Sequence, residues 1–223
     1  MPQTLALFDL DNTLIAGDSD HAWGEFLSNE GLVDADAHRK KNDQFYADYC
    51  SGGLDIKAYQ RFALSTIAGK SIDELVPLRT RFLQEMIAPM LLDAAQALVQ
   101  RHRDAGDLLM IITATNDFVT RPIADIFGIE HLIACEAEVI EGKYTGDIVG
   151  TPSYQEGKVE RLMAWLEDRE HSLAGSYFYS DSHNDIALLQ QVSNPVAVDP
   201  DDKLKGIALE RGWQIISLRS DAI

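Results

Sequence analysis

Short apolar runs recur along the chain, and helical patterns separate most of them. The apolar runs cover residues 4–10, 108–113, 177–179, 195–198 and 214–218. The helical patterns between them cover residues 91–102, 118–127, 156–166, 186–192 and 203–211. Runs this short are typical of strands buried on both faces of a parallel sheet. Strands that alternate with helices therefore predict a doubly wound α/β fold.

The stretch from residue 19 to residue 90 breaks this alternation, because it has helical periodicity throughout and no convincing strand. We expect helices at residues 19–28, 36–49, 55–67 and 71–86. Ser71 and Glu74 match a capping box at the start of the last helix. The sequence therefore predicts a core of residues 1–15 and 91–223, with a helical insertion at residues 16–90 after the first strand.

A second irregularity lies at residues 137–149, where the pattern indicates a hairpin that turns at Glu141 and Gly142. We expect this hairpin to be an appendage on the sheet.

Composition and charge limit the partners of the chain. Hydrophobic residues at 46% and charged residues at 25% are ordinary for a globular protein. The formal net charge of -17 argues against nucleic acid and anionic membranes, which bind proteins mainly through Lys and Arg. An anionic substrate would therefore need a bound cation to invert the local field.

The two cysteines, Cys50 and Cys135, form no CxxC pattern, so neither a disulfide framework nor a cysteine zinc site is indicated. The N-terminus lacks the basic region of a signal peptide, and no apolar run approaches the roughly 18 residues of a membrane span. We expect a cytoplasmic monomer or homodimer that is neither exported nor embedded in a membrane.

Two carboxylates, Asp9 and Asp11, follow the first apolar run in the segment DLDNT. Side chains two residues apart in an extended segment point the same way, so both would face the ligand site at the carboxyl end of the sheet. Such a pair can divide the work between a nucleophile and a proton donor. Taken alone, the same spacing is equally typical of a turn.

Two further candidates follow later strands. Thr113 ends the second apolar run, where its hydroxyl would donate to a phosphoryl oxygen or to the backbone. Lys158 lies at the start of a helix, a position that disfavours a cation unless an anion is nearby, although a surface lysine is the simpler interpretation.

The segment SDSHND, residues 180–185, follows the third apolar run and carries Asp181, Asn184 and Asp185. Oxygen ligands of this kind suit Mg²⁺, which takes one or two carboxylates and keeps positions for water and phosphate. Helix capping by Asp181 or Asn184 is the alternative. We expect His183 to face solvent or support the cluster, because transition-metal sites usually recruit several nitrogen or sulfur ligands.

These four motifs, in this order and at strand ends, resemble those of the haloacid dehalogenase-like hydrolase superfamily. The helical insertion resembles the C1 cap of its phosphoserine phosphatase-like branch, whose members include phosphoserine and histidinol phosphatases. The resemblance spans almost the whole chain and implies a Rossmann-like parallel core with a mobile helical cap.

The resemblance also implies a division of roles at a magnesium site. Asp9 would be the nucleophile and a Mg²⁺ ligand, and Asp11 would protonate the leaving oxygen and then activate water. The Asp11 backbone carbonyl and Asp181 would complete the metal site, while Asn184 and Asp185 would hold metal-bound waters.

On the substrate side, the resemblance implies that Thr113 binds a phosphoryl oxygen and Lys158 steadies the phosphoryl group. Asp18 and Arg61 fall where phosphoserine enzymes have an acidic residue and an arginine for the substrate, and Asn116 is a further substrate-binding candidate. The acidic and aromatic entrance of the cap would equally accept a cationic or imidazole-bearing substrate.

The predicted activity is magnesium-dependent hydrolysis of a small phosphorylated metabolite, similar to phosphoserine or histidinol phosphate, through an aspartyl-phosphate. A phosphotransferase and a non-enzymatic, receiver-like phosphorylation switch are the alternatives. Asp11 and the long insertion argue against the switch, and Asp11 with the cluster at residues 180–185 argues against a dehalogenase, which needs no metal.

Overall fold

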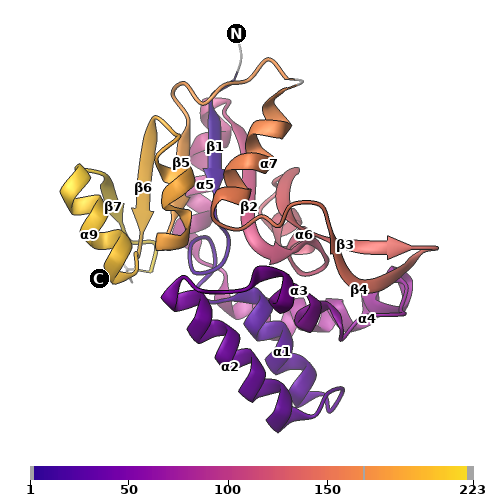
Figure 1. The fold of residues 1–223 in the computed structure, drawn as a ribbon. Helices are drawn as coiled ribbons and strands as arrows, with labels where there is room; N and C mark the ends of the chain where they lie inside the picture. Colours follow the sequence, from indigo (N-terminus) through magenta and orange to yellow (C-terminus); the bar gives the residue numbers. More distant parts are fainter. Residues whose placement is uncertain (1–2, 168, 220–223) are drawn as a thin grey trace.

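The central sheet of the computed structural model has seven strands within the described residues, 3–167 and 169–219 (Figure 1). The strands are β1 Leu5–Phe8, β2 Leu108–Asn116, β3 His131–Ile140, β4 Lys143–Val149, β5 Tyr177–Ser180, β6 Asn194–Val198 and β7 Gln214–Ile216. Their order is β4-β3-β2-β1-β5-β6-β7, and every neighbouring pair is parallel except β3 with β4. The predicted α/β fold with a mainly parallel sheet is confirmed.

Helices cover both faces of this sheet. Successive residues of β1 point to opposite sides: Ala6 and Phe8 belong to one buried cluster, whereas Leu5 and Leu7 belong to the other. Helices α5 Asp93–Ala105 and α6 Asp117–Ile126 pack in the first cluster, and α7 Glu156–Glu167, α8 Ile186–Leu189 and α9 Asp202–Arg211 pack in the second. Burial on both faces explains why the strands read as continuous apolar runs.

The predicted insertion is helical, and it lies beyond the carboxyl ends of the strands (Figure 1). It contains α1 Ser19–Asn29, α2 Ala35–Ser51, α3 Ile56–Leu64 and α4 Ile72–Phe82, followed by the short turns η1 Leu83–Ile87 and η2 Ala88–Met90. Aspartates cap the first three helices, and Ser71 with Glu74 forms the predicted capping box on α4. Ile15 pairs with Leu91, so the chain enters and leaves the helical layer at adjacent positions.

Trp23 and Phe26 of α1 are buried against Phe82 and, for Trp23, against Phe118 at the start of α6. These rings join the helical layer to the core, because side chains from both meet in one hydrophobic cluster. The helical spacing of the two aromatic residues therefore reflects packing.

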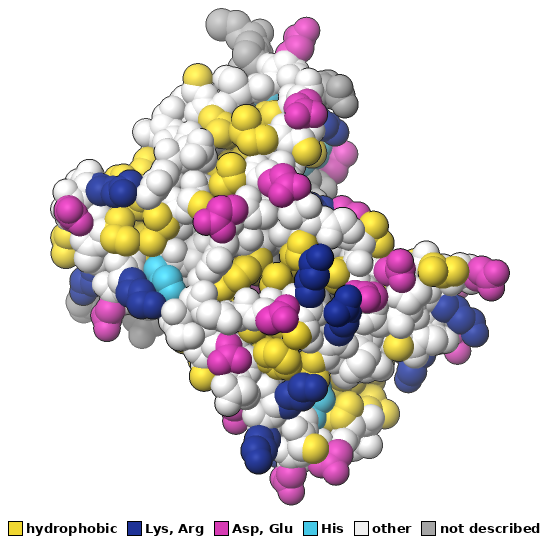
Figure 2. Space-filling model, in the orientation of Figure 1, with side chains coloured by type: hydrophobic (Ala, Val, Ile, Leu, Met, Phe, Trp, Pro, Cys, Tyr) yellow, Lys and Arg dark blue, Asp and Glu magenta, His cyan; other side chains and the backbone are white. Residues whose placement is uncertain are grey.

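The expected hairpin is present at the edge of the sheet, but its first strand is longer than predicted. Its turn does lie at Glu141 and Gly142, which both have positive φ (50° and 76°). However, β3 begins at His131 and pairs in parallel with β2, so the hairpin continues the main sheet. Its far strand also contacts α3, and a bridge joins Lys143 to Ser71. In space-filling form the hairpin projects beside the helical layer (Figure 2).

None of the helices in the described ranges combines the length and hydrophobicity that a membrane crossing would need.

Candidate active site

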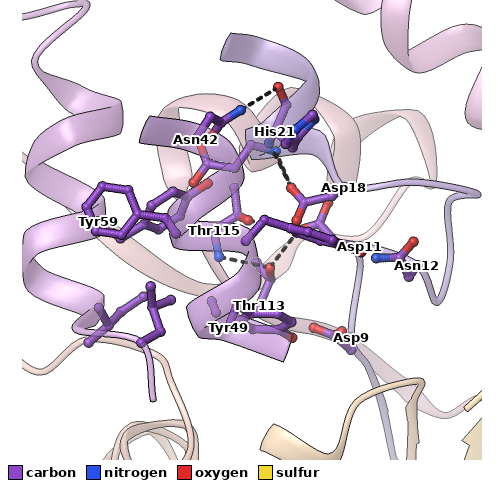
Figure 3. Close-up of a pocket in the computed structure, with 16 residues that line it drawn as sticks. Asp9, Asp11, Asn12, Asp18, His21, Asn42, Tyr49, Tyr59, Thr113 and Thr115 are labelled. Atoms are coloured by element: carbon purple, nitrogen blue, oxygen red, sulfur yellow. Dashed lines mark hydrogen bonds between the residues drawn. The ribbon is translucent and has the colours of Figure 1, made fainter. Parts of the chain in front are cut away.

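A cavity lies between the carboxyl ends of β1 and β2 and the helical layer (Figure 3). Its core side is formed by Asp9, Asp11, Asn12, Thr113, Ala114 and Thr115. Its other side comes from the insertion: Asp18, Asp20, His21, Asn42, Phe45, Tyr46, Tyr49, Leu54, Ile56 and Tyr59. Acidic and aromatic side chains therefore dominate the wall, and these lining residues include neither Lys nor Arg.

Asp9 and Lys158 form a buried ion pair at the base of this cavity. Lys158 Nζ lies 3.0 Å from Asp9 Oδ1 and 2.7 Å from Asp185 Oδ1, and the three side chains are almost completely buried. Burial opposes the charge on Lys158, but the Asp185 and Asp9 carboxylates outweigh it and raise the pKa of the lysine. Burial raises the pKa of Asp9 well above its ordinary value, although Lys158 counteracts this. The lysine at the helix start therefore has its anionic partners.

Asp11 is held by three donors beside Asp9. The Ser19 backbone N–H donates to Asp11 Oδ1 at 2.7 Å, and the Thr115 hydroxyl donates to Oδ2 at 2.8 Å. The Thr113 hydroxyl is 3.5 Å from the same oxygen (Figure 3). Burial raises the pKa of Asp11 despite these donors, which favour the ionised form. A carboxyl with a raised pKa can donate and accept a proton nearer neutral pH.

Asp181 lies beside this pair at the end of β5. The Thr13 hydroxyl donates to Asp181 Oδ1 at 3.0 Å, and the backbone N–H of Asp181 donates to the Thr13 hydroxyl oxygen at the same distance. Burial and the Asp185 carboxylate raise the pKa of Asp181 to about 7. Asp185 is itself held by Lys158 and by the Ser180 hydroxyl, which donates at 2.7 Å.

The carboxylates at the core end of the cavity fit a bound Mg²⁺. Asp9 and Asp181 both have raised pKa values because they are buried near other acids, and added positive charge would stabilise their ionised forms. Within the described ranges, no three His, Cys, Asp or Glu side chains converge as a complete metal site. Mg²⁺ needs no such convergence, because it commonly takes one or two carboxylates and completes its shell with water and phosphate oxygens.

The contacts of Asn184 differ from those expected of a residue that holds a metal-bound water. Its amide oxygen accepts from the Tyr154 hydroxyl at 3.1 Å and the Gln155 amide at 2.9 Å, and its amide nitrogen donates to the Tyr49 carbonyl at 3.1 Å. Both lone pairs of the oxygen are thus in use, so Asn184 has none left for a metal-bound water in this conformation. Instead it ties the end of α2 to the core.

A second contact at the same place joins the Tyr49 hydroxyl to the Ser182 hydroxyl at 3.1 Å. His183 does not point at the carboxylate cluster: its Nδ1 is 2.7 Å from Asp201 Oδ2, and its Nε2 is 3.4 Å from Lys203 Nζ. The His183 ring therefore contacts Asp201 and Lys203 at the edge of the cluster, and the role expected for it stays a prediction.

Two predicted substrate-binding residues do not reach the cavity. Arg61 is exposed and pairs with Asp147 of β4 at 3.0 Å, because it occupies the outward phase of α3 while Tyr59 of the same helix lines the cavity. Asn116 is buried behind the wall, where it caps α6 through Val119 and donates to Asp20 Oδ1 at 3.3 Å. Neither residue is among those that line the cavity, so a substrate contact by Arg61 or Asn116 stays a prediction.

Asp18 does line the cavity, but it also begins α1. Its Oδ1 accepts from the backbone N–H groups of Asp20 and His21 at 3.0 and 2.8 Å (Figure 3). Burial and the nearby Asp11 carboxylate raise the pKa of Asp18 to about 6. Asp20 is still more buried, at 3% exposure, and burial with the Asp18 and Asp11 carboxylates raises its pKa well above the ordinary value.

Sequence reasoning missed several lining residues. Thr115 follows Thr113 by two positions in β2, so the period of a strand could have placed both on one side. Asp20 belongs to the acidic and aromatic entrance expected from the sequence, but no sequence signal distinguished its burial. Tyr49 and Tyr59 lie at the facing ends of α2 and α3, and their convergence depends on how those helices pack.

Known proteins share both the sequence and the fold of this chain. The family model for haloacid dehalogenase-like hydrolases matches residues 6–190. The histidinol-phosphatase of Neisseria meningitidis serogroup C (strain 8013) is 45% identical over 221 residues, covering 97% of this chain and 100% of that protein. Phosphoserine phosphatase SerB1 of Mycobacterium tuberculosis H37Rv is 33% identical over 217 residues, covering 96% of this chain and 70% of that protein.

Solved structures of other proteins share the fold of this chain. A Bordetella pertussis Tohama I protein of unknown function has a TM-score of 0.90 at 44% identity, covering 98% of this chain and 100% of that chain. A substrate-bound phosphoserine phosphatase has a TM-score of 0.72 at 18% identity, covering 99% of this chain and 95% of that chain, which shows a shared fold.

Proposed function

The chain belongs to the haloacid dehalogenase-like hydrolase family and is a phosphatase, and from this premise we propose that it hydrolyses histidinol phosphate through a phosphoryl-aspartate at Asp9. The observation that carries the proposal is the pairing of Asp9 with Lys158, with Asp11 held beside them by Ser19 and Thr115. This arrangement supplies a nucleophile, a fixed positive charge and a proton donor at one end of a closed cavity.

In the first step, an oxygen of Asp9 attacks phosphorus, and the bond between phosphorus and the ester oxygen breaks. Asp11 gives its proton to the departing oxygen, so the alcohol leaves neutral. In the second step, water attacks the phosphoryl group on Asp9, and Asp11 takes the proton that this water loses. Inorganic phosphate leaves, and Asp9 is regenerated as a carboxylate.

Lys158 stays protonated through both steps and balances the charge on Asp9 and the phosphoryl oxygens. Thr113, whose hydroxyl lies near Asp11, is placed to donate to a phosphoryl oxygen. Asp9, Asp181 and the backbone carbonyl of Asp11 would hold the Mg²⁺ ion, and Asp185 would support this site through its contacts with Lys158 and Ser180. The ion would supply further neutralisation of the phosphoryl charge, which is where most catalysis of phosphoryl transfer lies.

The choice of substrate rests on the relative named histidinol-phosphatase and on the charge of the cavity wall. Phosphoserine carries a carboxylate, which would meet Asp18 and Asp20 without a Lys or Arg among the lining residues to receive it. Histidinol phosphate has an amine as phosphoserine does, but it lacks that carboxylate and carries an imidazole. Cationic groups are attracted both by acids and by aromatic faces such as those of Tyr49 and Tyr59.

We assign residues 16–90 to a cap that closes over the substrate, with the core formed by residues 1–15 and 91–223. The contacts of Tyr49 with Ser182 and Asn184 support a closed position of that cap. A reducing, cytoplasmic location suits the free thiols of Cys50 and Cys135.

The test is phosphate release from histidinol phosphate, phosphoserine and p-nitrophenyl phosphate, each with Mg²⁺ and with EDTA. We expect Mg²⁺-dependent turnover with kcat/KM at least tenfold higher for histidinol phosphate than for phosphoserine. Asp9→Asn should abolish release from all three esters, whereas Asp55→Asn, which alters an exposed helix cap outside the cavity, should behave as wild type. Full activity in EDTA would refute the metal role, and a preference for phosphoserine would refute the substrate.

A further inference from the structure

Asp20 is a buried acid with an unused oxygen. It lies in the first turn of α1, is 3% exposed and lines the cavity. Oδ1 accepts from the Asn116 amide at 3.3 Å, but Oδ2 has no hydrogen-bond partner among the residues that the structure describes. The Tyr59 hydroxyl comes close enough to lower the pKa of Asp20, yet its position does not meet hydrogen-bond geometry with Oδ2. Buried polar atoms are normally paired, so this oxygen is open to a donor from a bound molecule.

The neighbours of Asp20 define the charge of that partner. The charged groups that act on Asp20 include the Asp18 and Asp11 carboxylates, and the residues lining the cavity include no Lys or Arg. His21, the next residue, is near Asp43 on α2 at 3.5 Å. A further anion would therefore be repelled here, while an N–H cation would both donate to Oδ2 and offset the repulsion among the acids.

Asp18 is a weaker candidate for the same role. Its Oδ1 already accepts two backbone N–H bonds at the start of α1, and it is more exposed than Asp20. Asp20, by contrast, is held from behind by Asn116, which is itself fixed as the cap of α6. The fixed side chain thus presents Oδ2 without needing to reorganise, which favours binding.

We infer that Asp20 is the specificity-determining residue of this phosphatase and binds the cationic nitrogen of the substrate through Oδ2, while Asn116 positions its carboxylate. The inference rests on the proposed function, because the phosphoryl group must lie at Asp9 for the rest of the substrate to reach the cap. Tyr59 and Tyr49 would then border the cation with their rings.

The experiment compares wild type with Asp20→Asn on two substrates in Mg²⁺. Histidinol phosphate carries cationic nitrogen, and p-nitrophenyl phosphate does not. We expect Asp20→Asn to lower kcat/KM for histidinol phosphate by about 30-fold or more, mostly through KM, and to lower it for p-nitrophenyl phosphate by no more than about threefold. Asp20→Glu, which keeps the charge, should recover part of the loss, and Asp55→Asn should lose nothing on either substrate.

An equal loss on both substrates, or full activity of Asp20→Asn on histidinol phosphate, would overturn the inference. Because Asp20 is buried, its replacement can also impair folding. A binding measurement on wild type therefore tests the inference without any variant. Histidinol should inhibit p-nitrophenyl phosphate hydrolysis competitively and at least tenfold more tightly than histidine, whose carboxylate the acidic wall repels; equal inhibition would also overturn it. Failure of wild type to hydrolyse p-nitrophenyl phosphate in Mg²⁺ would instead refute the proposed function itself.

Discussion

Replacing Asp181 with Asn should stabilise the metal-free protein, even though it should abolish activity. Asp181 has a folded pKa of about 7, above the ordinary value of 3.8, because it is buried near Asp185. The folded protein therefore binds the proton more tightly than the unfolded chain, and stability falls as pH rises through the window between these two values. Asn carries no charge at any pH, and its Oδ1 can still accept the bond from Thr13.

The two pKa values set the size of the effect. Relative to a neutral side chain, ionisation of Asp181 lowers the free energy of unfolding by at most about 4 kcal/mol at pH 8 and about 2 kcal/mol at pH 5. Asp181 keeps some contact with solvent, which screens the charge, so we expect roughly half of these amounts. For a chain of 223 residues, about 2 kcal/mol corresponds to a rise in Tm of roughly 4–8 °C at pH 8, with a smaller rise at pH 5.

The assay is thermal unfolding of wild type and Asp181→Asn in EDTA at both pH values, then in Mg²⁺ at pH 8. Mg²⁺ at about 100 times its Kd would stabilise wild type by about 2.7 kcal/mol, and it should stabilise the variant far less. Asp55→Asn is the matched control, because it makes the same chemical change at an exposed site. A lower Tm of Asp181→Asn in EDTA at pH 8, or an equal shift at pH 5 and pH 8, would refute the reasoning.

Two further substitutions test other parts of the site, and a chemical modification tests the burial of the cysteines. Lys158→Met leaves two buried carboxylates without their ammonium partner, so we expect loss of activity and a fall of about 3 kcal/mol in the free energy of unfolding, measured by urea denaturation. Thr115→Val removes a donor that lowers the pKa of Asp11, so the pH at which Asp11 ionises should rise and kcat should fall about tenfold; a pH–rate profile checks both. Burial raises the pKa of Cys135 to about 12, so at pH 8 only about one in ten thousand of its thiols is ionised, and a thiol reagent should modify exposed Cys50 alone until the protein unfolds.

The residues on the core side of the cavity can be predicted from the sequence more directly than the residues on the insertion side. Asp9 and Asp181 each follow a strand and Thr113 lies in the last part of β2, and parallel strands bring their carboxyl ends to one edge whatever the details of packing. Lys158 could be placed beside them only through the family resemblance, because a lysine at a helix start has many possible partners.

Whether a residue of the insertion reaches the cavity depends on helix phase and packing, which its position in the sequence alone does not determine. Arg61 and Tyr59 are two positions apart on α3, and that spacing sends one side chain outward and the other into the cavity. Asn184 was expected to hold a metal-bound water, but its amide donates to the Tyr49 carbonyl near the end of α2. The missed strand at the start of β3 has a similar cause, since the chain runs on without a break into a hairpin that was recognised only by its turn.

The distribution of charge along the cavity has one more consequence for the substrate. At the core end, Lys158 and the proposed Mg²⁺ would offset Asp9, Asp181 and a phosphoryl group. At the cap end, Asp18 and Asp20 face the cavity with His21 but no Lys or Arg among the lining side chains, so a cationic group of the bound molecule would add to the offset there. The preferred substrate should therefore carry opposite charges at its two ends, and reversing the charge of its non-phosphoryl end should weaken binding more than shortening it. A series of phosphomonoesters of similar length with cationic, neutral and anionic ends tests this order, and equal KM values across the series would contradict it.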